Sequence, residues 1–121
     1  MYLFLQKLPV LLLLLSTLLL GACSKTPLKD NELQYVGYWK SYNGSTLEIM
    51  ANGGGSGKKL SFDGNASSSK EMSGAQVLVN GPVLSLKLMG MTMDYHVDAP
   101  PAAVNGKTTM KLDGMEYEKM N

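Results

Sequence analysis

Asn-Gly and Asp-Gly pairs recur at short intervals between residues 43 and 114, and they constrain the fold more than any other feature of the chain. Such pairs adopt the positive-φ conformations that two-residue β-hairpin turns require. The runs between them alternate apolar and polar residues, as half-buried strands do. We therefore expect an all-β domain, a small antiparallel barrel or sandwich of seven or eight short strands. The pairs are Asn43-Gly44, Asn52-Gly53, Asp63-Gly64, Asn80-Gly81, Asn105-Gly106 and Asp113-Gly114.

The strand register can be tested by asking whether a turn places apolar residues on one face. A two-residue turn at 89–90 pairs Leu86 with Met93 and Leu84 with Tyr95. The intervening residues are polar, so the two faces of this hairpin separate cleanly. The sequence therefore predicts a tight hairpin here.

The same test succeeds at residues 113–114. A two-residue turn there pairs Met110 with Tyr117 on one face and Lys111 with Glu116 on the other. An apolar pair and an oppositely charged pair thus fall on opposite sides of the sheet, as cross-strand pairing favours. We expect a second tight hairpin.

Two further hairpins are expected with different turn lengths. A two-residue loop at 43–44 mixes the faces, whereas a three-residue loop over 43–45 keeps them apart, and we expect a bulge with it. A turn at 80–81 extends the first apolar face, although Pro82 favours a looser connection because it lacks an amide hydrogen. The expected pairs are Trp39 with Ile49, and Val77 with Leu84.

Three stretches are expected to lie outside the strands. Residues 53–57 are mostly glycine and predict a flexible connection. Residues 65–74 are polar and predict a loop, and residues 98–101 contain two prolines that predict the end of a strand.

The first 23 residues have the pattern of an export signal. Leu8 to Leu20 form an apolar run after Lys7, the only charged residue that precedes Cys23. A secretory signal combines such a run with small residues at its cleavage site. The alternative is an uncleaved transmembrane helix over residues 3–22, which has about the ~20 residues needed to span a bilayer.

Leu20, Gly21, Ala22 and Cys23 resemble the lipobox of bacterial lipoproteins. The resemblance implies that the first three are recognised by the signal peptidase, that residues 1–22 are removed, and that the Cys23 thiol is lipidated. Two or more acyl chains, palmitate among them, anchor a protein stably. In Gram-negative lipoproteins a residue such as Ser24 at the next position implies the outer membrane, facing the periplasm.

The resemblance divides the chain into three parts: a signal peptide over 1–22, a lipidated cysteine with a polar tether over 23–32, and a small β domain over 33–121. Without Lys7 the 11 basic residues become ten, which equals the ten acidic residues, and the chain has no arginine. A nucleic-acid interface needs a basic stripe, so no nucleic-acid partner is expected. Because Cys23 is the only cysteine, lipidation leaves no thiol for a disulfide or a metal.

Gly37-Tyr38-Trp39 resembles the Gly-x-Trp signature of lipocalins. The resemblance implies an eight-stranded barrel in which the tryptophan closes one end, and a small apolar ligand inside. The alternative is that Trp39 is a large core residue of a small β domain.

Met91 and Met93 share one strand face, and His96 follows on the opposite face. Thioether ligands favour Cu(I) or Ag(I), so these methionines are candidate ligands of a periplasmic soft-metal binder. The alternative, favoured by the hairpin register, is that both fill the core, as methionine often does. On that basis we expect no bound metal or cofactor.

The sequence contains no arrangement of serine, histidine and acid that would support nucleophilic catalysis, so no enzymatic activity is expected. We expect an envelope lipoprotein with a noncatalytic binding, adaptor or structural domain, held at the membrane through Cys23, with an envelope protein as partner. A lipocalin-like carrier and a soft-metal binder are the alternatives. The outward-facing apolar residues form a candidate binding patch. They are Tyr38, Tyr42, Leu78 and Val83.

Overall fold

The chain folds into eight β-strands that follow one short 3-10 helix. The computed structural model describes residues 25–121. The helix, η1, spans Asp30–Tyr35. The strands are β1 (Gly37–Ser41), β2 (Thr46–Ile49), β3 (Gly54–Asp63), β4 (Ala66–Asn80), β5 (Val83–Leu88), β6 (Met91–Val104), β7 (Lys107–Leu112) and β8 (Met115–Lys119).

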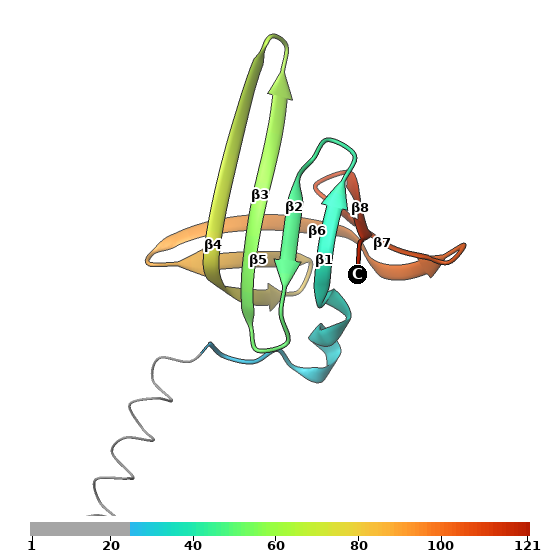
Figure 1. Ribbon diagram of the computed structural model, residues 1–121. Helices are drawn as coiled ribbons and strands as arrows, with labels where there is room; N and C mark the ends of the chain where they lie inside the picture. The colour runs from blue at the N-terminus through green and yellow to red at the C-terminus, as the bar shows by residue number, and fades with distance from the viewer. Residues whose placement is uncertain (1–24) are drawn as a thin grey trace, which may run out of the picture.

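Each strand pairs antiparallel with the next, and β8 returns to pair with β1, so that the sheet closes into a barrel (Figure 1). The expected all-β fold is confirmed, and of the two architectures it is the barrel that forms. Closure leaves no exposed edge along the closed part of the sheet. Two hairpins, β3–β4 and β6–β7, project from the barrel body (Figure 1).

Alternation along the strands builds the core. In β1 the first, third and fifth residues are buried and the second and fourth are exposed. The inward-facing side chains form one apolar cluster inside the barrel, and Trp39 and Tyr95 are fully enclosed within it. The buried apolar residues are Tyr35, Trp39, Leu47, Ile49, Met72, Ala75, Val77, Leu84, Leu86, Met93, Tyr95, Met110, Leu112 and Tyr117.

Both tight hairpins have the expected register. Leu86 lies opposite Met93, and Leu84 lies opposite Tyr95. The β7–β8 hairpin likewise has its predicted pairs on both faces. The hydrophobic pattern fixes these registers because a slip of one residue would turn every core side chain toward solvent.

The two looser hairpins are shifted by two residues from their expected registers. Trp39 lies opposite Leu47 rather than Ile49, because the loop is 42–44 rather than 43–45. The position of Gly44 explains this shift: its φ is +91°, and a three-residue hairpin loop needs glycine at its left-handed position. The faces are unchanged, because a shift of two preserves the inward and outward alternation.

In the β4–β5 hairpin, Val77 lies opposite Leu86 rather than Leu84. Asn80 pairs with Val83, so the turn residues are Gly81 and Pro82. This turn places the proline, which lacks an amide hydrogen, outside the ladder, where it removes no strand hydrogen bond.

The glycine-rich stretch is a strand, not a flexible connection. Gly55 and Gly57 lie in β3 and face the barrel interior. A Cβ added at Gly57 would lie 2.5 Å from the Tyr95 hydroxyl oxygen and 2.8 Å from the Met93 methyl carbon. Glycine is therefore needed for a reason that local sequence does not reveal, since side chains from the opposite wall reach this backbone.

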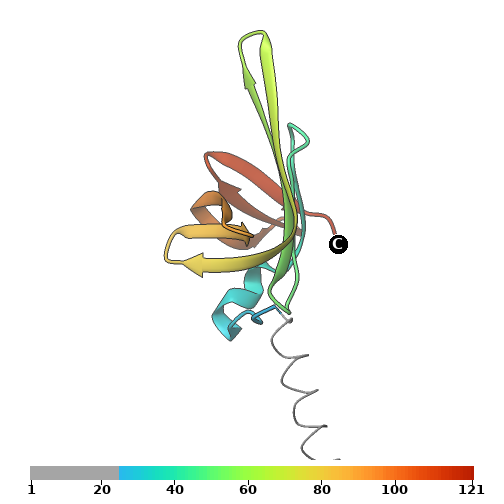
Figure 2. The ribbon, with the colours of Figure 1, turned by 90° about the vertical axis from the view of Figure 1, so that its left-hand side faces the viewer.

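The polar stretch over 65–74 is also a strand rather than a loop. Most of it belongs to β4, which pairs with β3 from Lys58–Glu71 to Asp63–Ala66. These residues form a two-stranded arm that extends past the barrel (Figure 2). Because the arm lies outside the core, it has no buried face and hence no apolar alternation for a sequence reading to detect.

Residues 98–101 do not end β6, contrary to expectation. The strand continues to Val104 through register shifts between Val97 and Ala99 and between Ala99 and Ala102. Such bulges accommodate proline within a strand because they release ladder hydrogen bonds.

The segment expected to be a tether is attached to the barrel from Thr26 onward. The Thr26 amide donates to the Gln76 side-chain oxygen at 2.8 Å, and the Gln76 amide group donates back to the Thr26 carbonyl at 2.9 Å. The Leu28 amide donates to the Ala51 carbonyl at 3.1 Å. Helix η1 follows, and its Tyr35 carbonyl accepts a hydrogen bond from the Trp39 indole at 2.9 Å.

The close approach at Gly57 predicts a sharp response to one added methyl group. Gly57→Ala should lower the free energy of unfolding by about 1–3 kcal/mol, the usual cost of overpacking a core. The backbone gain from replacing glycine, about 0.4–1 kcal/mol, is too small to offset this. Urea unfolding of the purified protein measures the change.

Tyr95→Phe provides the control, because the Tyr95 hydroxyl is the atom that the new methyl group would meet first. This hydroxyl is buried and has no hydrogen-bond partner among the described residues. Its removal alone should be neutral or stabilising, and in a double-mutant cycle it should reduce the cost of Gly57→Ala. Strictly additive losses would contradict the proposed contact.

Candidate functional site

A shallow groove crosses the outer surface of β7, β8 and β1, and we call it the outer groove. One half is a hollow of about 340 Å³ and the other a hollow of about 400 Å³. Thr109 and Glu116 line both halves, which makes the groove continuous. The remaining lining residues are Lys40, Ser41, Tyr42, Lys107, Glu118 and Met120 in the first half, and Ala99, Pro100, Ala102, Val104, Met110 and Lys111 in the second.

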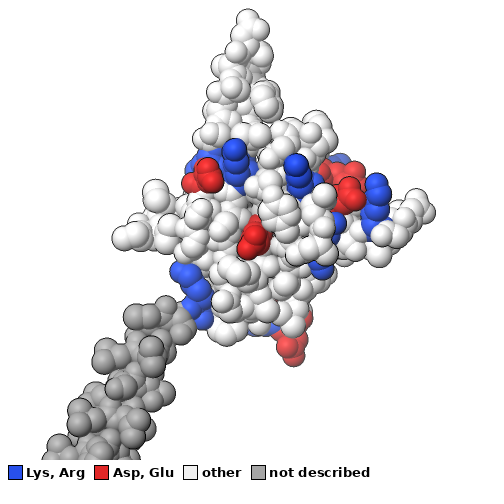
Figure 3. Space-filling view, in the orientation of Figure 1, with Lys and Arg blue, Asp and Glu red and all other residues white. Residues whose placement is uncertain are grey.

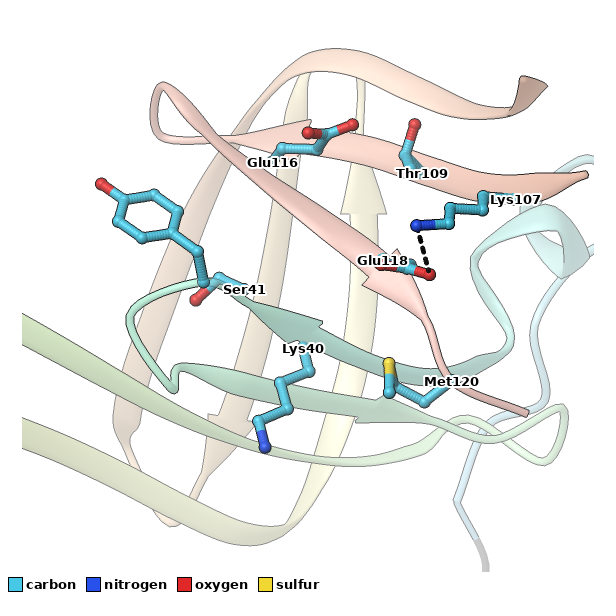
Figure 4. A pocket seen from close by; sticks show the side chains of 8 residues that line it. Lys40, Ser41, Lys107, Thr109, Glu116, Glu118 and Met120 are labelled. Atoms are coloured by element: carbon cyan, nitrogen blue, oxygen red, sulfur yellow. Dashed lines mark ion pairs between the residues drawn. The ribbon is translucent and has the colours of Figure 1, made fainter. Parts of the chain in front are cut away.

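The first half of the groove is charged. Glu118 of β8 lies between Lys40 of β1 and Thr109 of β7, its two cross-strand partners. The Lys107 ammonium lies 3.9 Å from a Glu118 carboxylate oxygen (Figure 4). Both partners are largely exposed, so this ion pair contributes little stability and leaves both charges accessible to a ligand.

The second half of the groove is apolar. Ala99, Pro100, Ala102 and Val104 come from the bulged part of β6, and Val104 is 56% exposed. The bulges explain the shape, because they bend a strand away from the regular path of the sheet. The combined groove thus offers apolar contact at one end and paired charges at the other.

A second cluster lies at the mouth of the barrel. Lys59 follows Gly57 on the inward face of β3, and its ammonium lies 4.1 Å from the centre of the Tyr95 ring. The same ammonium donates to the Asp94 carbonyl and to an Asp113 carboxylate oxygen at 3.1 Å. Lys59 therefore spans the opening from β3 to the β7–β8 turn and covers the aromatic ring.

Burial raises the pKa of the Tyr95 hydroxyl well above its usual range, with smaller contributions from Tyr117 and Asp113. The Tyr95 and Tyr117 rings meet edge to face with their centres 6.5 Å apart. Burial likewise raises the pKa of the Tyr117 hydroxyl. Both phenols thus stay neutral at physiological pH, and the mouth cluster presents only the Lys59 ammonium and the surrounding carboxylates as charges.

Asp98 links the bulged part of β6 to the β7–β8 turn. One carboxylate oxygen accepts a hydrogen bond from the Gly114 amide at 2.6 Å, and the other lies 3.0 Å from His96 Nδ1. The Gly114 hydrogen bond, followed by that with His96, lowers the pKa of Asp98 below its ordinary value of 3.8. His96 is therefore engaged in fixing a turn.

The candidate metal ligands from the sequence have different surroundings. Met93 is 1% exposed within the core, as the hairpin register predicted. Met91 was expected in the core as well, but it is 59% exposed. It is the first residue of β6, and the strand begins there beyond the packed part of the barrel. His96 lies on the outside, and residues 25–121 contain no cluster of three His, Cys, Asp or Glu side chains suited to a metal.

The barrel interior next to Trp39 is filled by side chains. Trp39 and Tyr95 are both completely buried, and the backbone of Gly57 lies directly against the tip of Tyr95. The side chains of Leu86 and Met93 occupy the remaining space beside the same glycine. Both halves of the outer groove lie on the outside of the barrel wall.

The expected outer patch is only partly assembled. Tyr38, Tyr42 and Leu78 are 37%, 88% and 40% exposed, as their outward positions predicted. They lie on β1, on the β1–β2 loop and on β4, and only Tyr42 lines the outer groove. Val83 is half-buried. Leu20, Gly21, Ala22 and Cys23, the residues predicted for cleavage and lipidation, lie outside the described residues.

Sequence reasoning missed the outer groove and the role of Lys59. The groove depends on the β6 bulges, and these were missed because the two prolines at 100–101 were interpreted as the end of the strand. One feature of the sequence could have indicated the role of Lys59. Strand alternation from Gly57 places Lys59 on the inward face, where a lysine without a partner is unfavourable, so a partner for its charge could have been expected.

Among residues 25–121, no helix combines the length and apolar character needed to cross a membrane. Comparison with known proteins gives no matching family, no similar curated protein and no similar solved structure.

The lowered pKa of Asp98 predicts a pH dependence of stability. Because the folded pKa is below the unfolded value, Asp98 stabilises the fold fully above about pH 4, and this contribution is lost as the pH falls through the folded pKa. Urea unfolding should show Asp98→Asn to be less stable than wild type at neutral pH, with the difference shrinking below about pH 4.

Glu71→Gln is the matched control, since it removes an exposed carboxylate of the arm. Its stability relative to wild type should change much less between neutral and acidic pH. An equal pH response in the two variants would refute the assigned role of Asp98.

Proposed function

We propose that this protein is an envelope lipoprotein whose barrel is a noncatalytic binding module, and that it binds its partner at the outer groove. Cys23 supplies the membrane anchor in this proposal, and the outer membrane facing the periplasm is its location. The single observation that supports a surface role is the packing of Tyr95 against Gly57 within the cluster of buried apolar side chains that occupies the barrel interior.

The filled interior distinguishes this proposal from the lipocalin-like alternative. A carrier of an apolar ligand needs an enclosed cavity lined by apolar side chains. Here Trp39 and Tyr95 are both fully buried in the apolar cluster inside the barrel, and the Trp39 indole donates to the Tyr35 carbonyl of η1. Binding at the outer wall requires no rearrangement of these residues.

The chemistry of the outer groove suits a polypeptide partner. Apolar contact from Pro100 and Val104 adjoins the exposed ring of Tyr42 and the paired charges of Lys107 and Glu118. Interfaces commonly combine an apolar centre with a polar rim. Charges of both signs are interspersed on the molecular surface, with no large patch of one sign in view (Figure 3), so shape and apolar contact matter more than net charge.

Site-directed photocrosslinking in living cells tests the groove. A photoreactive residue in place of Thr109, at the centre of the groove, should give one discrete crosslinked product. The same residue in place of Ser85, which faces outward on β5, is the matched control and should give none. Crosslinking at Ser85 but not at Thr109 would refute the groove as the binding face.

A charge reversal tests the specificity of that product. Glu118→Lys should abolish the Thr109 crosslink, because it removes the carboxylate next to Lys107 and opposite Lys40. The groove would then carry three lysines and lose the negative charge that a partner would meet there. Glu71→Lys, an exposed reversal on the arm, should leave it intact. Unchanged crosslinking in Glu118→Lys would mean that the charged half of the groove takes no part in binding.

A further inference from the structure

The barrel has one end from which the chain leads toward Cys23, and this end carries exposed apolar side chains. The hydrogen bonds between Thr26 and Gln76 fix the chain to β4. Gln76 pairs in turn with Lys87, the penultimate residue of β5. The attachment at Thr26 and the β5–β6 turn, which begins two residues later at Met89, therefore both adjoin the β4–β5 strand pair.

The β5–β6 turn is unusually apolar for an exposed hairpin. Met89 and Met91 flank Gly90, and they are 93% and 59% exposed. Met50, which is 41% exposed, adds a third methionine, next to the Ala51 carbonyl that binds the Leu28 amide. Neither the outer groove nor the core uses these side chains, and turns of this kind normally carry polar residues.

The charged groups near this end are mixed. Lys25, Lys29 and Lys87 are cationic, whereas Asp30 and Glu32 of η1 are anionic. The Glu32 side chain accepts a hydrogen bond from the Lys29 amide at 2.9 Å, so it helps to begin the helix. The lysines are suited to lipid phosphates, and the apolar methionines are suited to the acyl boundary beneath them.

The reach of the chain sets how far this end lies from a lipid on Cys23. Two residues, Ser24 and Lys25, lie between Cys23 and Thr26. The chain therefore makes three Cα-to-Cα steps, each of which spans at most about 3.6 Å when fully extended. The attachment at Thr26 is therefore within roughly 11 Å of the lipidated cysteine, far less than an unattached tether to residue 32 would allow. So short a link keeps the end of the barrel around Thr26 close to the bilayer.

We propose that this face, formed by Met50, Met89 and Met91 with Lys25, Lys29 and Lys87, docks on the lipid surface and sets the orientation of the barrel. The proposal rests on the proposed lipidation of Cys23. In this orientation the β2–β3 turn and the β5–β6 turn lie in the interfacial region. The β3–β4 arm projects from the barrel on the side opposite the β2–β3 turn (Figures 1 and 2), so it extends away from the bilayer. The ten residues of β3 carry the arm tip roughly 33 Å from the β2–β3 turn.

Depth-dependent quenching tests this docking. The full chain is purified in its lipidated form and reconstituted in vesicles of phosphatidylethanolamine and phosphatidylglycerol, with and without nitroxide-labelled lipid. Met89→Cys then carries the only free thiol, because the Cys23 sulfur is blocked by its thioether bond to diacylglycerol, and it is labelled with bimane. Phe62→Cys at the arm is the matched control, since Phe62 is also an exposed apolar residue, at 65%.

Nitroxide lipid should quench the bimane at position 89 at least twofold and leave the bimane at position 62 unchanged. Equal quenching at the two positions in a lipidated, vesicle-bound protein would overturn the docking face while leaving the anchoring intact. An intact mass without acyl chains would instead overturn the anchoring, and the docking face that rests on it.

Methionine oxidation gives a second readout on the unmutated protein. Met89 is more exposed than Met120, at 93% against 55%. In the protein without vesicles, chloramine-T should therefore oxidise Met89 faster than Met120. On vesicles we expect the order to reverse, with Met89 oxidised several-fold more slowly than Met120. Faster oxidation of Met89 on vesicles would contradict docking of the β5–β6 turn.

Discussion

The barrel depends on the contact between the tip of Tyr95 and the backbone of Gly57. A small eight-stranded barrel has room inside only for its own side chains, and here one long side chain spans from β6 to β3. The contact requires glycine on the receiving strand, because a Cβ would lie 2.5 Å from the phenolic oxygen. It leaves that oxygen buried without a partner among the described residues, a cost that is acceptable only where apolar packing around the ring is extensive.

The remaining features follow from this arrangement. With Tyr95 across the interior, Lys59 can lie over its ring and bind Asp113 at the mouth. Helix η1 is joined to the same core through buried Tyr35 and its hydrogen bond with the Trp39 indole. The interior is thereby occupied by the protein itself, which is why we propose the outer wall as the binding face. The β6 bulges shape that wall, and the same strand begins with Met91 at the end we assign to the membrane.

Parts of this structure could be predicted from the sequence because they depend on residues that are close together in the chain. The Met89-Gly90 and Asp113-Gly114 turns fixed two registers, since strict alternation on both sides admits only one pairing. The 42–44 loop and the Gly81-Pro82 turn differed by two residues, a shift that the hydrophobic pattern cannot detect. The β3 glycines were misread because their requirement comes from the distant Tyr95, and the arm was misread because it has no buried face. The outer groove depends on bulges that no periodicity reveals.

Nuclear Overhauser effects test most directly whether Tyr95 and its neighbours fill the barrel interior. In the isotope-labelled protein in solution, the ring protons of Tyr95 should show strong effects to the α-protons of Gly57 and to the methyl groups of Met93 and Leu86. Absence of the Gly57 effects, with the Tyr95 ring contacting protons of a co-purified apolar ligand instead, would contradict the account and favour an interior carrier.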